Sequence, residues 1–214
     1  MFRVLRYRKT IGTKPADSDA GWRGAYERLD VPTQLTAETW TRFVSEALVE
    51  QWLAAYRVST SWRPEITEID QGSLTFLFDA APTFKQLGYG DDRVVAVWGL
   101  SSSPEHSRDR RRLAGFLPLP DRWSGGGLDR GHFVAHTAGG GLDLNLFPQL
   151  SQLNRGRSAQ GRRWREMERY AAQHPLTPLF VRPSYSDNSW RPATIDYGLV
   201  RGGELWVERF DNAS

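Results

Sequence analysis

The sequence predicts an α+β fold with a mixed or antiparallel sheet. Apolar residues recur at helical spacing before residue 60 and again around residue 165. Short β-branched or aromatic runs, bounded by Gly, Pro and charged residues, lie between and after these stretches and are typical of strands. Apolar residues make up 39% of the chain and charged residues 25%, which is ordinary for a globular protein.

The first helix is expected over residues 37–57, with Thr36 as its N-cap. Its apolar residues recur at spacings near three and four and form one face. They are Trp40, Phe43, Ala47, Leu48, Trp52 and Tyr56. A stripe of this kind is typical of packing in a core or against a partner helix, and not of a cofactor site.

Strands are expected in the N-terminal segment and in four later runs. The ranges are 2–7, two strands around Gly72 within 66–78, 94–100, 178–185 and 205–210. A second helix over 160–173 places Trp164, Met167 and either Tyr170 or Ala171 on one face and ends at Pro175. Trp164 at this spacing is expected to lie in the core.

A division of the chain near residue 90 is weakly marked. Residues 1–90 are predicted to form an N-terminal helical and strand extension or a small domain of unknown role, and residues 91–214 the domain that carries the chemistry. The alternative is that residues 1–90 extend the same core. The N-terminal half is rich in Trp and balanced in charge, so a protein-interaction role for it stays open.

Composition excludes several classes of site. The chain has no Cys, so disulfides, thiolate metal sites and Cys nucleophiles are excluded. No apolar run is long enough to span a membrane, and no membrane contact is expected. We read no signal peptide. We therefore expect a protein that acts in the cytoplasm or is delivered by a dedicated secretion system.

Arginine is concentrated in one segment. The net charge is +3, and residues 155–169 alone hold six Arg and two Glu. Arg suits bidentate phosphate contacts, and residues 108–112 form a second candidate clamp. A solvated basic helix face explains the same charges equally well, so charge alone does not decide between these readings.

Residues 129–168 combine side chains that suit phosphodiester hydrolysis. His132 can accept a proton from water at neutral pH. Arg130 lies two residues earlier, so in a strand both side chains point to one face. The amide oxygens of Asn145 and Asn154 suit a hard divalent cation.

Structural explanations compete with these assignments. His136 is expected to be a structural or surface histidine, because no second ligand set accompanies it. Asn154 precedes Gly156 and suits a turn, although a turn can still present its side chain. Glu168 could form a surface pair with a neighbouring Arg almost as readily as serve a site.

Four ordered submotifs resemble the DNA/RNA non-specific endonuclease family. They are DRGH (129–132), N-L-x-P-Q (Asn145, Leu146, Pro148, Gln149), L-N-x-G (Leu153, Asn154, Gly156) and W-x-x-x-E (Trp164, Glu168). This family belongs to the ββα-metal, or His-Me finger, superfamily and includes the Serratia-type nuclease. The resemblance covers residues 93–200 and implies a ββα-metal nuclease core within residues 91–214.

The resemblance implies a role for each matching residue. His132 is the general base, Arg130 stabilises the transition state, and Asn145 donates hydrogen bonds near the base or the metal. Asn154 is the sole direct protein ligand of Mg²⁺ or Mn²⁺, and Glu168 orients the metal-bound waters. The products carry 5′-phosphate and 3′-hydroxyl ends.

The chain departs from the family pattern in two places. Seven residues separate Gly156 from Trp164, where the Serratia-type pattern is tighter. The helix start can shift as a result, which leaves Glu166 as a competitor of Glu168. After DRGH the chain reads FVAHTAGGG, which is closer to the streptodornase-like branch.

The predicted function is a metal-dependent endonuclease that hydrolyses DNA and RNA without sequence specificity. The expected nucleic-acid contacts are Arg155, Arg157, Arg162 and Arg163. As the toxin part of a bacterial effector, the chain would have an immunity or inhibitor protein as a partner. The alternative is a non-catalytic nucleic-acid-binding module that retains the nuclease fold.

Overall fold

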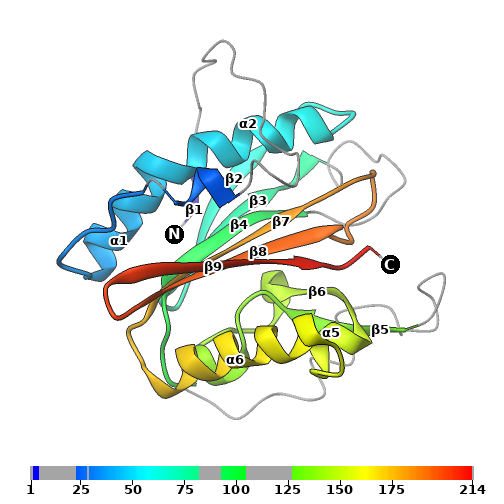
Figure 1. Ribbon diagram of the computed structural model, residues 1–214. Coiled ribbons are helices and arrows are strands. Elements are labelled where there is room, and N and C mark those ends of the chain that lie inside the picture. Colours follow the sequence, from blue (N-terminus) through cyan, green and yellow to red (C-terminus); the bar gives the residue numbers. More distant parts are fainter. Residues whose placement is uncertain (1, 5–22, 28, 82–92, 105–126, 214) are drawn as a thin grey trace.

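A seven-stranded antiparallel sheet forms the middle layer of the molecule (Figure 1). The computed structural model describes residues 2–4, 23–27, 29–81, 93–104 and 127–213. The strands lie in the order β1 (Phe2–Val4), β2 (Ile66–Gln71), β3 (Leu74–Asp79), β4 (Arg93–Leu100), β7 (Pro178–Ser184), β8 (Thr194–Arg201) and β9 (Glu204–Asp211). Helices and antiparallel sheet together confirm the predicted α+β class.

The sheet runs across the predicted division at residue 90. β3 and β4 are antiparallel neighbours, with Leu77 opposite Ala96 and Phe76 opposite Val97. β1, β2 and β3 therefore share one sheet with the four strands that follow residue 90. The sequence left two alternatives for residues 1–90, a separate small domain and an extension of the same core. The shared sheet has the arrangement of the second.

The predicted N-terminal helix covers one face of the sheet. Thr36 caps α1 (Ala37–Val44) in a capping box with Thr39. The helix continues through a π-helical stretch, η2 (Ser45–Val49), into α2 (Glu50–Ser59). Trp40 is fully buried, and its indole Nε1 donates to the backbone oxygen of Leu179 across 3.1 Å. The apolar stripe thus lies in the core as expected, whereas the π-helical turn was not predicted.

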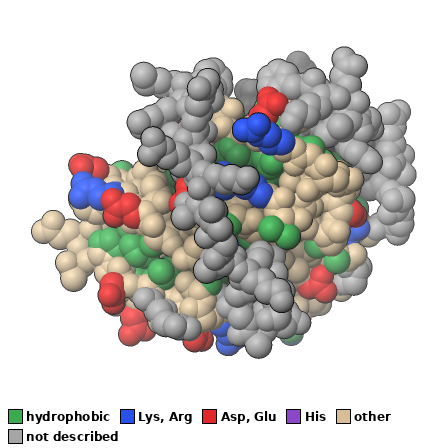
Figure 2. Space-filling view, turned by 90° about the horizontal axis from the view of Figure 1, so that it is seen from above, with side chains coloured by type: hydrophobic (Ala, Val, Ile, Leu, Met, Phe, Trp, Pro, Cys, Tyr) green, Lys and Arg blue, Asp and Glu red, His purple; other side chains and the backbone are tan. Residues whose placement is uncertain are grey.

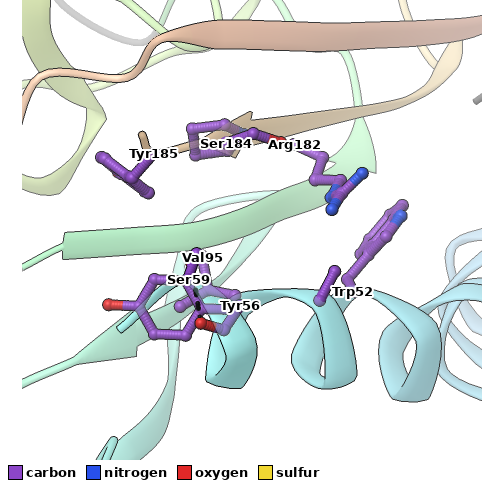
Figure 3. A pocket seen from close by; sticks show the side chains of 9 residues that line it. Trp52, Tyr56, Ser59, Val95, Arg182, Ser184 and Tyr185 are labelled. Atoms are coloured by element: carbon purple, nitrogen blue, oxygen red, sulfur yellow. Dashed lines mark hydrogen bonds between the residues drawn. The ribbon is translucent and has the colours of Figure 1, made fainter. Parts of the chain in front are cut away.

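The interface between α2 and the sheet includes a buried hydrogen bond. Tyr56 Oη donates to the buried carboxylate of Asp79 at 2.8 Å. Figure 3 shows Trp52, Tyr56 and Ser59 of α2 facing Arg182 and Ser184 of β7 across a cavity of about 20 Å³. That volume holds about one water, so the cavity is a packing defect and not a substrate site.

The outer surface of this helical layer is mixed in character. Figure 2 views it from above and shows acidic and basic side chains interspersed, with hydrophobic side chains in small groups. Among the described residues, the large hydrophobic side chains that are clearly exposed are Val58 and Leu176. No helix in the described part of the chain combines the length and apolar character needed to cross a membrane.

The opposite face of the sheet carries a β-hairpin and two helices (Figure 1). The hairpin joins β5 (Leu128–His132) to β6 (Leu146–Leu150), with the short turns η4 (His136–Ala138) and η5 (Asp143–Asn145) in the connection. α5 (Ser151–Asn154) follows β6 directly, and α6 (Ala159–Gln173) comes next. Their apolar side chains share one core with β3, β4, β7, β8 and β9.

Sequence patterns predicted most of these elements but missed three strands and one short helix. β5, β6, β8 and α5 lie outside the predicted ranges, whereas α6 lies within one residue of its predicted range. The run over β8 does alternate, and Gly202 and Gly203 after it adopt positive φ in the turn to β9. Two consecutive glycines between two strand-like runs were the signal for a hairpin at that point.

Candidate functional site

β5 carries the DRGH sequence as a regular strand. It pairs antiparallel with β6, with Arg130 opposite Pro148 and His132 opposite Leu146. Alternation along the strand places Arg130 and His132 on one face, as predicted. Both side chains are half-buried, so the strand holds each of them partly in the core and partly within reach of solvent.

Gly131 is required by packing across the hairpin. A Cβ at position 131 would lie 2.3 Å from Oε1 and 2.4 Å from Cβ of Gln149, which is fully buried on the neighbouring strand. Any side chain there would displace Gln149 or separate β5 from β6. The glycine of DRGH therefore allows β5 and β6 to lie at their normal distance at the point between Arg130 and His132.

Asn145 fixes the chain that leaves His132. Its side chain is fully buried, and Oδ1 accepts from the backbone N–H of Val134 at 2.9 Å. Nδ2 donates to the backbone oxygens of Val134 at 2.8 Å and Gly141 at 2.9 Å. The backbone oxygen of Asn145 accepts from the N–H of Phe133, next to His132, and every polar atom of its side-chain amide is engaged with backbone. The structure thus gives Asn145 a positioning role.

Asp129 joins the hairpin to α5. Its Oδ2 accepts from Nδ2 of Asn154 at 3.1 Å and from Nε of Arg155 at 2.7 Å. Its Oδ1 accepts from Nη2 of Arg155 at 2.6 Å. The carboxylate thus fixes the last turn of α5 against β5. His132 lies three residues further along that strand, about 10 Å away at the usual rise per residue.

The pKa of Asp129 lies below its ordinary value. Partial burial raises it, but hydrogen bonds from Arg155, Asn154 and Ser151 and the charge of Arg155 together outweigh that effect. The carboxylate is therefore ionised at neutral pH and keeps a negative charge beside Asn154.

α6 separates the two candidate glutamates. Ser158 caps the helix by accepting from the N–H of Gly161 at 2.9 Å, so the extra residues after Gly156 lead into a normal helix start. Residues two positions apart on a helix differ by about 200° in direction. Glu166 is exposed and pairs with Arg163 at 2.9 Å, whereas Glu168 is half-buried.

Glu168 lies on the inner side of α6. Its charge helps to raise the pKa of Tyr197, a buried residue of β8, although burial is the larger cause. Tyr197 also packs edge-on against Trp164, which is fully buried, as predicted, on the same helix. The geometry therefore favours Glu168 over Glu166 as the carboxylate that faces inward.

The four arginines expected to contact nucleic acid have different surroundings. Arg155 is paired with Asp129, and Arg163 pairs with Glu166 and lies 5.6 Å from the centre of the Trp206 ring. Arg157 and Arg162 are exposed. The basic run 108–112 lies outside the described residues. All four are exposed, and within the described part of the chain ion pairs involve Arg155 and Arg163 but not Arg157 or Arg162.

Two of the remaining histidines make local contacts. His136 opens η4, with Nδ1 at 3.4 Å from the backbone oxygen of Gly140, in agreement with a local structural role. His174 follows α6, has its Nδ1 at 2.9 Å from the backbone oxygen of Tyr170, and stacks on that ring. His106 lies outside the described residues.

The donor set around Asn154 fits a hydrated divalent cation. Because its amide nitrogen donates to Asp129, the amide oxygen Oδ1 is turned away from that carboxylate. Within the described residues, no hydrogen bond to this oxygen competes with a cation. Amide and carboxylate oxygens, with water in the other positions, are the surroundings that Mg²⁺ prefers.

Comparison of the chain with family models and with curated proteins gave no match.

Proposed function

We propose that the protein is a metal-dependent endonuclease that hydrolyses DNA and RNA phosphodiesters without sequence preference. One observation carries the proposal: Asp129 ties the strand that presents Arg130 and His132 to the helix end that presents Asn154. The contact holds the DRGH strand and the end of α5 together. The residue types that the two elements carry suit phosphodiester hydrolysis.

His132 is assigned the proton transfer. Its imidazole takes a proton from water as the water oxygen forms a bond to phosphorus, and the bond from phosphorus to the 3′ oxygen breaks. The leaving 3′ oxygen takes a proton from solvent water. Arg130, on the same face of β5, neutralises charge on the phosphate oxygens during this step. The 5′-phosphate and 3′-hydroxyl ends follow from cleavage on that side.

Asn154 is assigned to hold Mg²⁺ or Mn²⁺ through Oδ1. The cation, when bound, supplies positive charge to the scissile phosphate and the leaving oxygen. Asp129 keeps the amide in the orientation that presents Oδ1. Glu168, half-buried on the inner side of α6, orients water in the space between the helix and the hairpin.

Low sequence specificity is expected from the available contacts. Arg157 and Arg162 are exposed cations on the segment that joins α5 to α6 and on α6 itself. Such side chains bind phosphates, which carry no sequence information. Binding should therefore weaken as salt increases, through release of counterions.

Cleavage of plasmid DNA and total RNA by the purified chain tests this proposal. We expect degradation of both with Mg²⁺ and none with EDTA or in a His132→Ala variant. A His174→Ala variant is the matched control, because that histidine is exposed and its imidazole contacts Tyr170 of its own helix end. Salt-sensitive DNA binding without cleavage in any divalent metal would instead identify a non-catalytic nucleic-acid-binding module.

A further inference from the structure

Arg155 holds Asp129 by both of its carboxylate oxygens. Nε donates to Oδ2 at 2.7 Å and Nη2 donates to Oδ1 at 2.6 Å, which is the bidentate geometry that a guanidinium forms with a carboxylate. The Arg155 side chain is 50% exposed, whereas that of Asp129 is only 13% exposed. The Arg155 guanidinium thus lies on the solvent side of the Asp129 carboxylate, which is itself mostly buried.

The same carboxylate sets the orientation of Asn154. Oδ2 of Asp129 accepts from both Asn154 and Arg155, so rotation of the carboxylate would disrupt both contacts together. If the Asn154 amide turned over, its N–H₂ group would replace Oδ1 at the position facing a cation. An N–H₂ group cannot be a ligand of Mg²⁺, so the orientation of this amide decides whether the site can bind a cation.

α5 is a single turn, Ser151–Asn154, and its cap residue Arg155 leads directly into Gly156 at φ 70°. The backbone of the turn is held at its start by the N–H of Ser151, which donates to the oxygen of Gly127 at 2.6 Å. Asp129 also accepts a hydrogen bond from the Ser151 side chain. Ser151, Asn154 and the cap residue Arg155 therefore all bind β5 through the carboxylate of Asp129. Arg155 binds this carboxylate on its solvent side.

We infer that Arg155 is a positioning residue for metal binding, acting through Asp129 on Asn154, and not a contact for nucleic acid. This inference rests on the proposed function, because it assigns a role at the same site. It replaces the expectation that Arg155 binds phosphate. The Arg155 guanidinium is already paired with an ionised carboxylate, and a bidentate contact with phosphate would require this ion pair to break.

Charge and geometry make opposite predictions for substitutions at this position. A lysine keeps the positive charge but cannot hold both carboxylate oxygens in a fixed plane. If Arg155 acted on the metal only by charge, Arg155→Lys would change nothing and Arg155→Ala would strengthen cation binding by removing a repulsion. If it acts by positioning, Arg155→Lys weakens cation binding.

Two measurements on the full chain test the inference. Mn²⁺ binding is followed by electron paramagnetic resonance of the free ion, and binding of a fluorescent DNA duplex is followed in EDTA as salt is varied. All variants carry His132→Ala so that the DNA stays intact. Arg162→Ala is the comparison variant, because Arg162 is exposed on α6 and is proposed to contact phosphate.

We expect Arg155→Lys to weaken Mn²⁺ binding by about ten-fold, as substitution of outer partners of a metal ligand does. Its salt dependence of DNA binding should match that of the parent. Arg162→Ala should show the reverse, with unchanged Mn²⁺ affinity and a salt slope smaller by about one. Unchanged melting temperatures of both variants would show that they are folded.

Two results would overturn the inference. One is Mn²⁺ affinity equal to the parent in Arg155→Lys; the other is a reduced salt slope in Arg155→Ala, which would make Arg155 a phosphate contact. A parent chain that takes up no Mn²⁺ would be a different failure, since it would remove the proposed metal site itself and this inference with it.

Discussion

The side-chain amide of Asn154 donates to the carboxylate of Asp129 across 3.1 Å and so links two elements that are 25 residues apart in the chain. Asp129 belongs to the strand that presents His132, and Asn154 ends the helix that follows the hairpin. The contact holds the Asn154 amide against β5 at Asp129, whose backbone lies about 10 Å along the strand from that of His132.

Substitution of Asp129 by Asn should impair the site without removing the side chain. An amide at position 129 has lost the charge that Arg155 binds and can no longer accept on both atoms. We expect cleavage to fall by roughly ten- to a hundred-fold and the Mg²⁺ concentration for half-maximal rate to rise. Initial rates across a Mg²⁺ titration measure both. Wild-type Mg²⁺ dependence in this variant would exclude the proposed role of Asp129.

The two glutamates on α6 form a matched pair for substitution. Glu168→Gln removes the charge that faces inward, and we expect cleavage to fall by roughly ten- to a hundred-fold. Glu166→Gln alters an exposed pair with Arg163 and should leave the rate near that of the wild type. Both are measured on plasmid DNA at saturating Mg²⁺. The reverse ranking would place the helix in a different register relative to the site.

Asn145→Ala should lower stability. The change leaves the backbone N–H and C=O of Val134 and the C=O of Gly141 without their buried partner. Buried groups left in this state cost about 1–3 kcal/mol each, so a loss of a few kcal/mol is expected in urea unfolding. Asn188→Ala, which removes one exposed hydrogen bond to Ser61, is the control and should have little effect. Equal stability of the two variants would contradict the assigned clamp.

Alkaline titration tests the burial of tyrosines in the two cores. The pKa of Tyr26, Tyr56, Tyr185 and Tyr197 is raised above the ordinary value near 10, with burial as the largest cause in each. A raised pKa in the folded state means that stability is complete below pH 10 and is lost as the pH rises above it. Four of the seven tyrosines should therefore ionise only on unfolding.

Phenolate absorbance and circular dichroism, recorded together, follow both events. Ionisation of these four tyrosines before any loss of circular dichroism would show that their side chains are not buried as described.

Local patterns in the sequence were sufficient for the longer helices. Helical periodicity and the Thr36 cap marked α1 and α2, and the spacing of Arg130 and His132 gives them a shared face because they lie in a strand, β5, which the patterns did not predict. These features depend on neighbours within a few residues, which a single sequence displays directly. The same holds for Trp164, whose burial follows from the apolar face of α6.

Contacts between distant residues could not be predicted in this way. Arg155 appeared as one of several arginines in a basic segment, and only the fold shows that Asp129, 26 residues earlier, holds it. The full engagement of Asn145 with backbone and the packing of Gln149 on Gly131 have the same origin. Each requires the register of the hairpin, and β6 was not recognised as a strand.

The central claim is that a cation held by Asn154 lies close to His132. Alternation along β5 directs Asp129 and His132 to opposite faces, so a cation held by Asn154 must lie beside the strand, within reach of both faces, to approach His132. Only four histidines occur in the chain, and their imidazole signals can be assigned by substitution in a proton NMR spectrum.

Titration of Mn²⁺ into the purified chain, with those imidazole signals recorded at each step, tests the claim most directly. The account predicts that the His132 signal broadens first, at Mn²⁺ concentrations that leave His174 sharp, and that Asn154→Ala abolishes the effect. A sharp His132 signal while others broaden, or broadening that persists in Asn154→Ala, would contradict it.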